Sequence, residues 1–292
     1  MPVPSWASWA AVDWSAFRER AGPASAGGDA VAVDLAGGGA SLQAAAAARH
    51  AAVLALLFPA STEHSVFPPE EQPDSRVAAG RPPCDGDMVH VLFTRRAASL
   101  RSHGGEVAFP GGKRDEEDVA LAATMRAGLE ETLEDEEQAV DAITALREAE
   151  EEVGLGRPAG GASATMLPFD PSAVHLLSVL PHYVSRHGLN VRPVVAELRS
   201  PFLPIPSADE VAHVFSVPLH LFLLDDQHEA SDILWSGHVV RLHYFRHGGE
   251  VVWGMTASIA IAIARLVFNR EPSFPLAPAE DDVKRVRRKH NL

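Results

Sequence analysis

The stretch REAEEEVGL, residues 147–155, places four glutamates within five positions of a predicted helix that a glycine closes. On a helix of about 3.6 residues per turn, Glu148, Glu151 and Glu152 share one face, whereas Glu150 points elsewhere. An exposed acidic face costs only about a few tenths of a kcal/mol per like-charge pair. In an enclosed cleft, carboxylates about 5 Å apart repel by roughly 3 kcal/mol, and three hard oxygen donors suit Mg²⁺ or Mn²⁺. The stretch alone leaves both interpretations open.

A basic segment lies upstream of the glutamates. Residues 94–114 contain five lysine or arginine side chains and one glutamate, a local charge of +4 in a chain of net charge −14. Such a segment would attract the phosphates of a nucleotide. For Arg95 and Arg114, surface exposure or pairing with acidic side chains is an equal alternative.

FPGGK, residues 109–113, followed later by REAEEEVGL, resembles the signature of the Nudix hydrolases, in which a glycine and a spacer precede Arg-Glu-apolar-any-Glu-Glu-any-Gly-apolar. The matching positions are Arg147, Glu148, Ala149, Glu151, Glu152, Gly154 and Leu155. Residues 92–112 are also similar to the motif of the coenzyme A pyrophosphatase branch, and only Phe93 departs, where leucine is usual. The matches there are Leu92, Thr94, Arg96, Ala97, Arg101, Gly105, Phe109, Pro110, Gly111 and Gly112. With later similar blocks, the resemblance covers about residues 49–265.

The resemblance implies a hydrolase of phosphoanhydrides that depends on Mg²⁺ or Mn²⁺. Glu148, Glu151 and Glu152 would be catalytic residues and metal ligands, with a carbonyl of Gly112 as a further ligand. Arg147, also assigned to the catalytic set, would pair with a neighbouring carboxylate and orient the helix against its loop. The fourteen histidines contain no His-Glu-x-x-His pairing, so the sequence does not predict zinc.

The residues expected to bind substrate are Arg96, Arg101, Gly111 and Lys113. Arg96 and Arg101 occupy positions of the coenzyme A motif and are candidates for the phosphates. A glycine lets the backbone approach a phosphate or cation closely. The general base stays open, because the candidate glutamates include Glu106 and Glu210 as well as Glu151.

One departure from the family is an insertion. Twenty-eight residues, 119–146, separate Asp118 from the Arg-Glu pair, where the family has a short spacer. Within them, TMRAGLEET (124–132) imitates the motif. It has Ala127 in place of the first metal-binding glutamate, and Leu133, the residue that follows the stretch, stands in place of the closing glycine. We therefore assign the site to residues 147–155. The acidic insertion, about 119–143, is predicted to be an exposed loop or amphipathic helix.

The predicted fold class is α/β, a Nudix-type α/β/α sandwich with a mixed β-sheet. Apolar runs predict strands at 51–58, 88–94, 175–184, 191–198, 213–219, 239–245 and 250–254, and helical patterns cover 119–154 and 256–268. The Nudix domain is assigned to residues 48–270, after a flexible N-terminal extension (1–47) and before a C-terminal tail (271–292).

Composition limits the partners and the compartment. The net charge of −14 argues against nucleic acid and against an anionic membrane as partners. The single cysteine, Cys84, indicates a reducing compartment, and no targeting signal stands out. We expect an intracellular, soluble protein; the sequence does not choose among cytoplasm, a peroxisome-like organelle and mitochondrion, and it leaves a homodimer open.

The sequence thus predicts a Nudix pyrophosphohydrolase that cleaves coenzyme A or acyl-CoA, a small-molecule substrate, to 3′,5′-ADP and (acyl-)4′-phosphopantetheine. An alternative within the class is a broader nucleoside-diphosphate hydrolase that acts on ADP-ribose, dinucleotides or capped RNA. A second alternative is a non-catalytic Nudix module that senses a nucleotide or binds a protein.

Overall fold

A computed structural model of the chain describes residues 7–21, 49–59, 88–129, 133, 135–157, 173–185, 188–200, 202–235 and 237–290. The helices are α1 (Trp14–Ala21), α4 (Glu116–Leu129), α5 (Glu136–Val153), α6 (Gly254–Phe268) and α7 (Glu280–Lys289), with 3-10 turns at Trp9–Ala11 and Leu219–Leu223. None of the described helices has the length and apolar character needed to cross a membrane.

The main sheet is mixed. Its strands are β1 (His50–Pro59), β2 (Val89–Arg96), β3 (Val107–Ala108), β4 (Gly111–Lys113), β5 (Val174–Val179), β6 (Tyr183–Val184), β7 (Asn190–Leu198) and β8 (Val211–Pro218). The strand order is β3-β2-β1-β7-β5, with β4 on β1, β6 on β7 and β8 on β2. Only β1 and β7 pair in parallel; the other described pairs are antiparallel. The mixed sheet expected from the sequence is confirmed.

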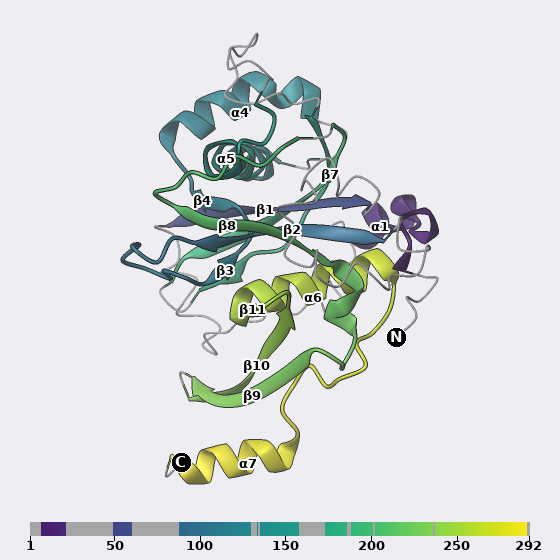
Figure 1. Cartoon of the computed structure of the whole chain (residues 1–292), viewed down its shortest axis with the longest axis vertical. Coiled ribbons are helices and arrows are strands. Elements are labelled where there is room, and N and C mark those ends of the chain that lie inside the picture. The colour runs from purple at the N-terminus through teal and green to yellow at the C-terminus, as the bar shows by residue number, and fades with distance from the viewer. Residues whose placement is uncertain are drawn as a thin grey trace.

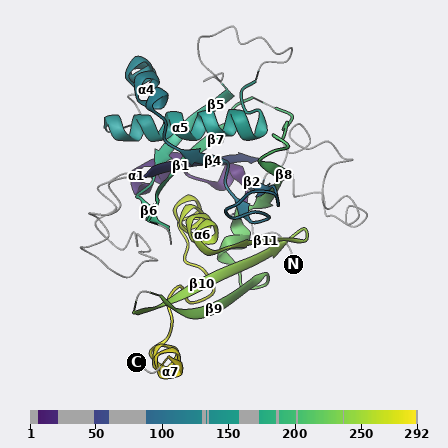
Figure 2. The ribbon, with the colours of Figure 1, turned by 90° about the vertical axis from the view of Figure 1, so that its left-hand side faces the viewer.

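Helices cover both faces of this sheet (Figures 1 and 2). Along β1, Leu54 and Leu56 pack with α5, whereas Ala55 and Leu57 belong to the cluster that contains α6. A strand buried on both faces reads as a continuous apolar run, which explains the pattern of residues 51–58. The arrangement is the predicted α/β/α sandwich, with α5 and α6 as the outer layers.

The helical region 119–154 is two helices, so the prediction of one continuous helical segment is wrong in its boundaries. α5 begins where the Asp135 carboxylate accepts a hydrogen bond of 2.7 Å from the Gln138 N–H. It ends at Gly154, whose φ of 75° is the left-handed conformation that glycine adopts without strain. Within the predicted exposed insertion, residues 139–143 are buried in α5 against the sheet, which corrects that expectation for these five residues.

Part of the predicted flexible extension is packed. Residues 7–21 form α1 and a 3-10 turn, and Phe17 is fully buried in the cluster with α6. Trp9 and Trp14 lie 4.5 Å apart between ring centroids and pack on the same cluster. The expectation of flexibility is therefore wrong for 7–21; residues 22–48 lie outside the described part.

A second sheet and α7 follow the main sheet. The second sheet is antiparallel and consists of β9 (His228–Trp235), β10 (His238–His247) and β11 (Glu250–Trp253). Its strand order is β11-β10-β9. Figure 2 shows α6 between the two sheets, and α7 beyond the second one. The sequence analysis missed β9 because its apolar residues are interrupted by charged ones, and it missed α7 because that helix is strongly polar.

The predicted C-terminal tail is held by histidines of the second sheet. Phe274 stacks on His228 with ring centroids 3.7 Å apart, and the His228 and His243 rings share a hydrogen bond of 2.9 Å. His243 Nε2 faces the Leu276 carbonyl at 3.3 Å. Burial, followed by the neighbouring His228, lowers the pKa of His243 to about 4.

This histidine gives a pH-dependent stability. Because its pKa is lower in the folded chain than the unfolded value of about 6.5, its contribution is complete above pH 6.5 and is lost as the pH falls toward 4. We expect the free energy of unfolding to fall about 2–3 kcal/mol more in wild type than in His243→Gln between pH 7 and pH 4.5. Urea denaturation at both pH values measures this; parallel losses in the two proteins would contradict it.

Candidate active site

The last turns of α5 lie against β4, whose residues Gly111–Lys113 are called here the glycine loop. The Gly111 N–H donates to Glu152 Oε2 at 3.2 Å. The carboxylate of Glu148 lies so close to the Gly112 backbone that a Cβ at position 112 would collide with it. A Cβ at Gly111 would meet the β1 backbone, and its φ of 155° also favours glycine. The two glycines therefore allow β4 and the glutamates to come together.

Arg147 connects the parts of this site. Its Nε donates to Asp118 Oδ1 at 2.8 Å, and one terminal nitrogen donates to Asp118 Oδ2 at 3.1 Å. The same guanidinium donates at 3.1 Å to Glu148 Oε1, to Glu151 Oε2 and to the Lys113 carbonyl. Arg147 therefore pairs with a carboxylate, as predicted; its role in orienting the helix stays a prediction.

Asp118 is the buried end of this ion pair, with 1% of its side chain exposed. Its Oδ2 also accepts hydrogen bonds from the Thr144 hydroxyl at 2.8 Å and from the Asp115 N–H at 2.9 Å. Burial alone would raise the pKa of Asp118, but the bonds from Arg147, Asp115 and Thr144 outweigh it and leave the pKa lowered. Asp118 is therefore a fixed anion that positions Arg147.

The pKa values of Glu148 and Glu152 are shifted in the opposite direction, upward. Burial is the main cause that raises the pKa of Glu152 to about 8, and the charges of Glu148 and Glu210 raise it further. Burial also raises the pKa of Glu148, with Glu151 and Glu210 adding to it, while Arg147 opposes the shift. Glu150 points away and pairs with Arg157, as the helical spacing predicted.

This donor set fits a divalent cation. Glu148 and Glu152 are withdrawn from water, with 15% and 3% of their side chains exposed, whereas Glu151 is 52% exposed at the rim. Hard carboxylate and carbonyl oxygens are the ligands that Mg²⁺ and Mn²⁺ prefer, and a cation would hold both buried carboxylates ionised. That these glutamates and Gly112 are metal ligands stays a prediction.

The basic residues fall into two groups. Arg96 lies 3.6 Å from Glu152 Oε1, and so belongs to the site. Arg95 pairs with Glu250 and Arg114 with Asp141, both within 3 Å, which favours the alternative of pairing for these two. Among the described residues, the Arg101 side chain has no hydrogen bond or ion pair and is exposed in the loop after β2.

Sequence reasoning placed Glu210 among three candidate bases but could not bring it to the site. The structure does so, because its charge acts on both Glu148 and Glu152. The Ala97 N–H, just after β2, donates to the Glu210 carbonyl at 2.8 Å and fixes this segment. Thr144 was missed altogether, and nothing in its sequence context distinguishes it from a core threonine. Lys113 contributes its carbonyl, while its side chain is exposed.

The stretch that imitates the motif, TMRAGLEET (124–132), lies partly outside the described residues. Its glutamates, Glu130 and Glu131, lie outside the described residues, so their exclusion from the site stays a prediction. The described geometry nevertheless assembles residues 147–152 with Asp118 and the glycine loop, as the assignment of the site to residues 147–155 requires.

Curated relatives show the family. A coenzyme A diphosphatase, peroxisomal NUDT7 of Mus musculus, is 32% identical over 197 residues, 65% of this chain and 69% of that protein. The Nudix hydrolase NudL of Cronobacter sakazakii is 38% identical over 177 residues, 60% of this chain and 73% of that protein. The chain belongs to the Nudix hydrolase family.

Other comparisons delimit the assignment. The mitochondrial Nudix hydrolase 15 of Arabidopsis thaliana is 37% identical over 65% of this chain, which spans only 56% of that relative. The solved Nudix hydrolase from Alicyclobacillus acidocaldarius aligns with 60% of this chain at a TM-score of 0.35 and 19% identity, too loosely to add to the family assignment. No family model matches this Nudix hydrolase.

Removal of the buried partner of Arg147 tests its positioning role. We expect Asp118→Ala to lower the free energy of unfolding by about 3–5 kcal/mol, because it leaves a half-buried guanidinium without its main counter-charge. Asp115→Ala is the matched control, since Asp115 lies 3.6 Å from the same arginine but is 66% exposed; it should cost less than about 1 kcal/mol. Urea denaturation compares the two, and equal small losses would contradict the role given to Asp118.

Proposed function

We propose that this Nudix hydrolase splits the pyrophosphate of coenzyme A or acyl-CoA, with Mg²⁺ or Mn²⁺, to 3′,5′-ADP and (acyl-)4′-phosphopantetheine. The observation that carries the proposal is the 3.6 Å approach of Arg96, from the coenzyme A motif, to the buried Glu152 of the Nudix motif. This contact would place an arginine that binds phosphate beside a glutamate that binds the metal ion. The similarity to a relative named as a coenzyme A diphosphatase supports this choice of substrate.

Glu148, Glu151 and Glu152, with the Gly112 carbonyl, would hold the cation. Divalent ions screen the charge of a phosphoanhydride and lower the pKa of water. Arg147 keeps Glu148 and Glu151 in place through the contacts at 3.1 Å, and the Gly111 N–H does the same for Glu152. Because Arg147 also pairs with Asp118, its positive charge is shared with this aspartate and does not act on the glutamates alone.

Among the three candidate bases, we favour Glu210. Glu151 is tied to Arg147 at 3.1 Å and Glu106 to His103 at 2.9 Å, whereas the carboxylate of Glu210 has no hydrogen bond or ion pair with the described residues. Glu210 would take a proton from the attacking water. The water oxygen then bonds to one phosphorus while the bridging P–O bond breaks and the second phosphate leaves.

Arg96 and Arg101 would bind the phosphates of the substrate. Both guanidinium groups can form fork-like contacts that a lysine cannot reproduce. Arg101 is available for this because it has no other described partner, while Arg96, 3.6 Å from Glu152, would lie between a bound phosphate and this carboxylate. Substrate phosphate would then compete with Glu152 for Arg96 and free this carboxylate for the cation.

Replacing one buried carboxylate by its amide tests the metal site. We expect Glu148→Gln and Glu152→Gln to lower turnover by orders of magnitude, because the cation loses a charged ligand, while the fold is retained. Glu150→Gln, on the same helix, should be nearly silent, since Glu150 pairs with Arg157 away from the site. Equal, modest losses in all three variants would support a solvated acidic face instead.

Substrate selectivity is tested at Arg101. A lost charged contact costs about 1.5–3 kcal/mol, so Arg101→Ala should lower kcat/KM for coenzyme A by roughly 10- to 150-fold and narrow its advantage over ADP-ribose. Arg285→Ala, on α7 and 75% exposed, is the control that should change neither value.

Both substrates are compared in wild type and variants, with products identified by mass. A wild type that hydrolyses ADP-ribose or a dinucleotide better than coenzyme A would leave a broader Nudix hydrolase. A wild type without metal-dependent turnover on any of these substrates would favour a non-catalytic module.

A further inference from the structure

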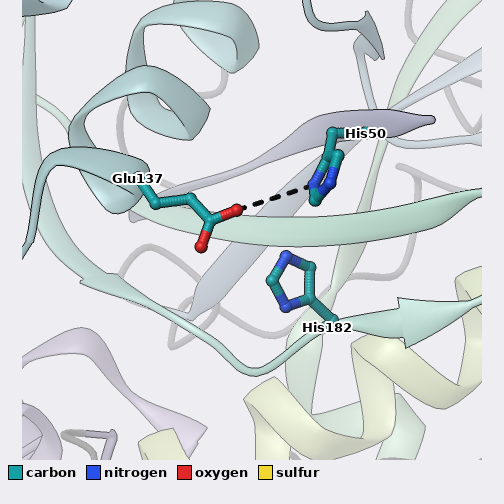
Figure 3. Close-up of side chains that lie close together, drawn as sticks. All are labelled: His50, Glu137 and His182. Atoms are coloured by element: carbon teal, nitrogen blue, oxygen red, sulfur yellow. Dashed lines mark ion pairs between the residues drawn. The ribbon is translucent and has the colours of Figure 1, made fainter. Parts of the chain in front are cut away.

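A second cluster of potential ligands lies at the opposite end of α5. Figure 3 shows His50, Glu137 and His182 pointing toward one another. His50 is the first residue of β1, Glu137 lies in the first turn of α5, and His182 directly precedes β6. One ligand atom from each residue lies within 4.8 Å of the others, and His50 Nδ1 is 3.7 Å from Glu137 Oε1. Three segments far apart in sequence thus meet at one point.

Buried polar atoms around this point lack hydrogen bonds. Of the ten such atoms in the described residues, five belong to residues in or next to this cluster: His50 Nδ1, His182 Nε2, Arg114 Nε, Asp141 Oδ2 and Arg192 Nε. A buried polar group without a partner costs free energy, and in native proteins it often marks a water or an ion. Asp141 Oδ2 and Arg192 Nε form an ion pair at 3.4 Å, which leaves the two imidazole nitrogens as the atoms open to a ligand.

We propose that His50, Glu137 and His182 bind a divalent transition-metal ion of the Zn²⁺ type. This site is separate from the glutamate cluster, because Glu148 lies eleven positions after Glu137 on α5, a rise of about 16 Å along the helix. It adds a metal to the protein that the Nudix motif does not account for.

The donor chemistry selects the class of metal. Two imidazole nitrogens and one carboxylate are the set found in open zinc sites, whereas Mg²⁺ prefers oxygen alone. Ligand bonds of about 2.0–2.2 Å place two ligand atoms of a tetrahedral site about 3.4 Å apart. The observed 3.7 Å between His50 and Glu137 is close to this value, the ligand atoms of all three residues lie within 4.8 Å of one another, and the Glu137 side chain, 46% exposed, has room to move inward.

Metal binding would be coupled to a rotation of the Arg192 side chain. Its terminal nitrogen lies 3.2 Å from His182 Nδ1, and since a guanidinium only donates, the proton of a neutral His182 is then on Nε2. A metal on Nε2 moves this proton to Nδ1, which would expel Arg192. Asp141 Oδ2, an acceptor without a hydrogen bond, lies 3.4 Å from Arg192 Nε and is the position to which the arginine turns.

The site would act on stability. It ties the start of α5 to β1 and to the residue before β6, and a ligand that binds only the folded chain stabilises it by mass action. Turnover at the other end of α5 would not require it. Sequence analysis could not find this site, because residues 50, 137 and 182 form no local motif.

The test is a titration of the metal-free protein with Co²⁺ in excess Mg²⁺, so that oxygen-only sites are filled. The visible absorption of Co²⁺ bound by imidazole is the readout, and competition by Zn²⁺ gives the affinity. We expect one equivalent in wild type and at least about a tenfold weaker affinity in Glu137→Gln and His182→Gln. His238→Gln, an exposed histidine on β10, should bind as wild type does.

A thermal unfolding series completes the test. Zn²⁺ should raise the unfolding temperature of wild type and of His238→Gln, but not that of Glu137→Gln, whose exposed side chain can change without loss of the fold. Absence of a one-equivalent Co²⁺ signal in wild type, or the same affinity in all four proteins, would overturn the proposal and leave a hydrated polar cluster. Neither outcome bears on hydrolysis, which is measured separately with Mg²⁺.

Discussion

The bidentate ion pair between Arg147 and Asp118 is the interaction on which the candidate active site depends. Arg147 stands among several carboxylates and would, without a dedicated partner, be free to neutralise the glutamates that should face a cation. Asp118 holds it from a buried position, through hydrogen bonds of 2.8 and 3.1 Å. The remaining donors of the arginine then fix Glu148, Glu151 and the glycine loop. The result is one carboxylate with a lowered pKa and two with raised values within one site. Such a division separates a structural anion from potential metal ligands.

The same ion pair brings together two residues that are far apart in the sequence. α4 leaves the site at Asp118 and α5 returns to it at Arg147, so the two residues meet although twenty-eight residues separate the aspartate from the arginine. The N-terminal part of α5 belongs to these twenty-eight residues and places Glu137 beside His50 and His182. One helix therefore carries the glutamate cluster at its C-terminal end and the proposed transition-metal site at its start.

Patterns that depend on neighbouring residues were predictable from the sequence. β1 and β7 are long apolar runs, and the glutamate face of α5 follows from helical spacing. Short or polar elements were not: β3 and β4 have two and three residues, and they exist because β1 and β2 supply their partners. Contacts between distant segments were also out of reach, such as Glu210 beside Glu148 or Phe17 beneath α6. Such contacts depend on the tertiary fold, which overrides local propensity.

The central claim is that the buried carboxylates of Glu148 and Glu152, which lie against the backbone of Gly111 and Gly112, form a cation site, and the location of a bound metal tests this most directly. Anomalous diffraction from crystals of the protein grown with Mn²⁺ would locate the ion. We expect an anomalous peak for an ion bound to carboxylate oxygens of Glu148 and Glu152, beside the Gly112 backbone, with Arg147 still paired to Asp118. Mn²⁺ peaks found only elsewhere, with Glu152 held by Arg96 and Gly111 alone, would contradict it.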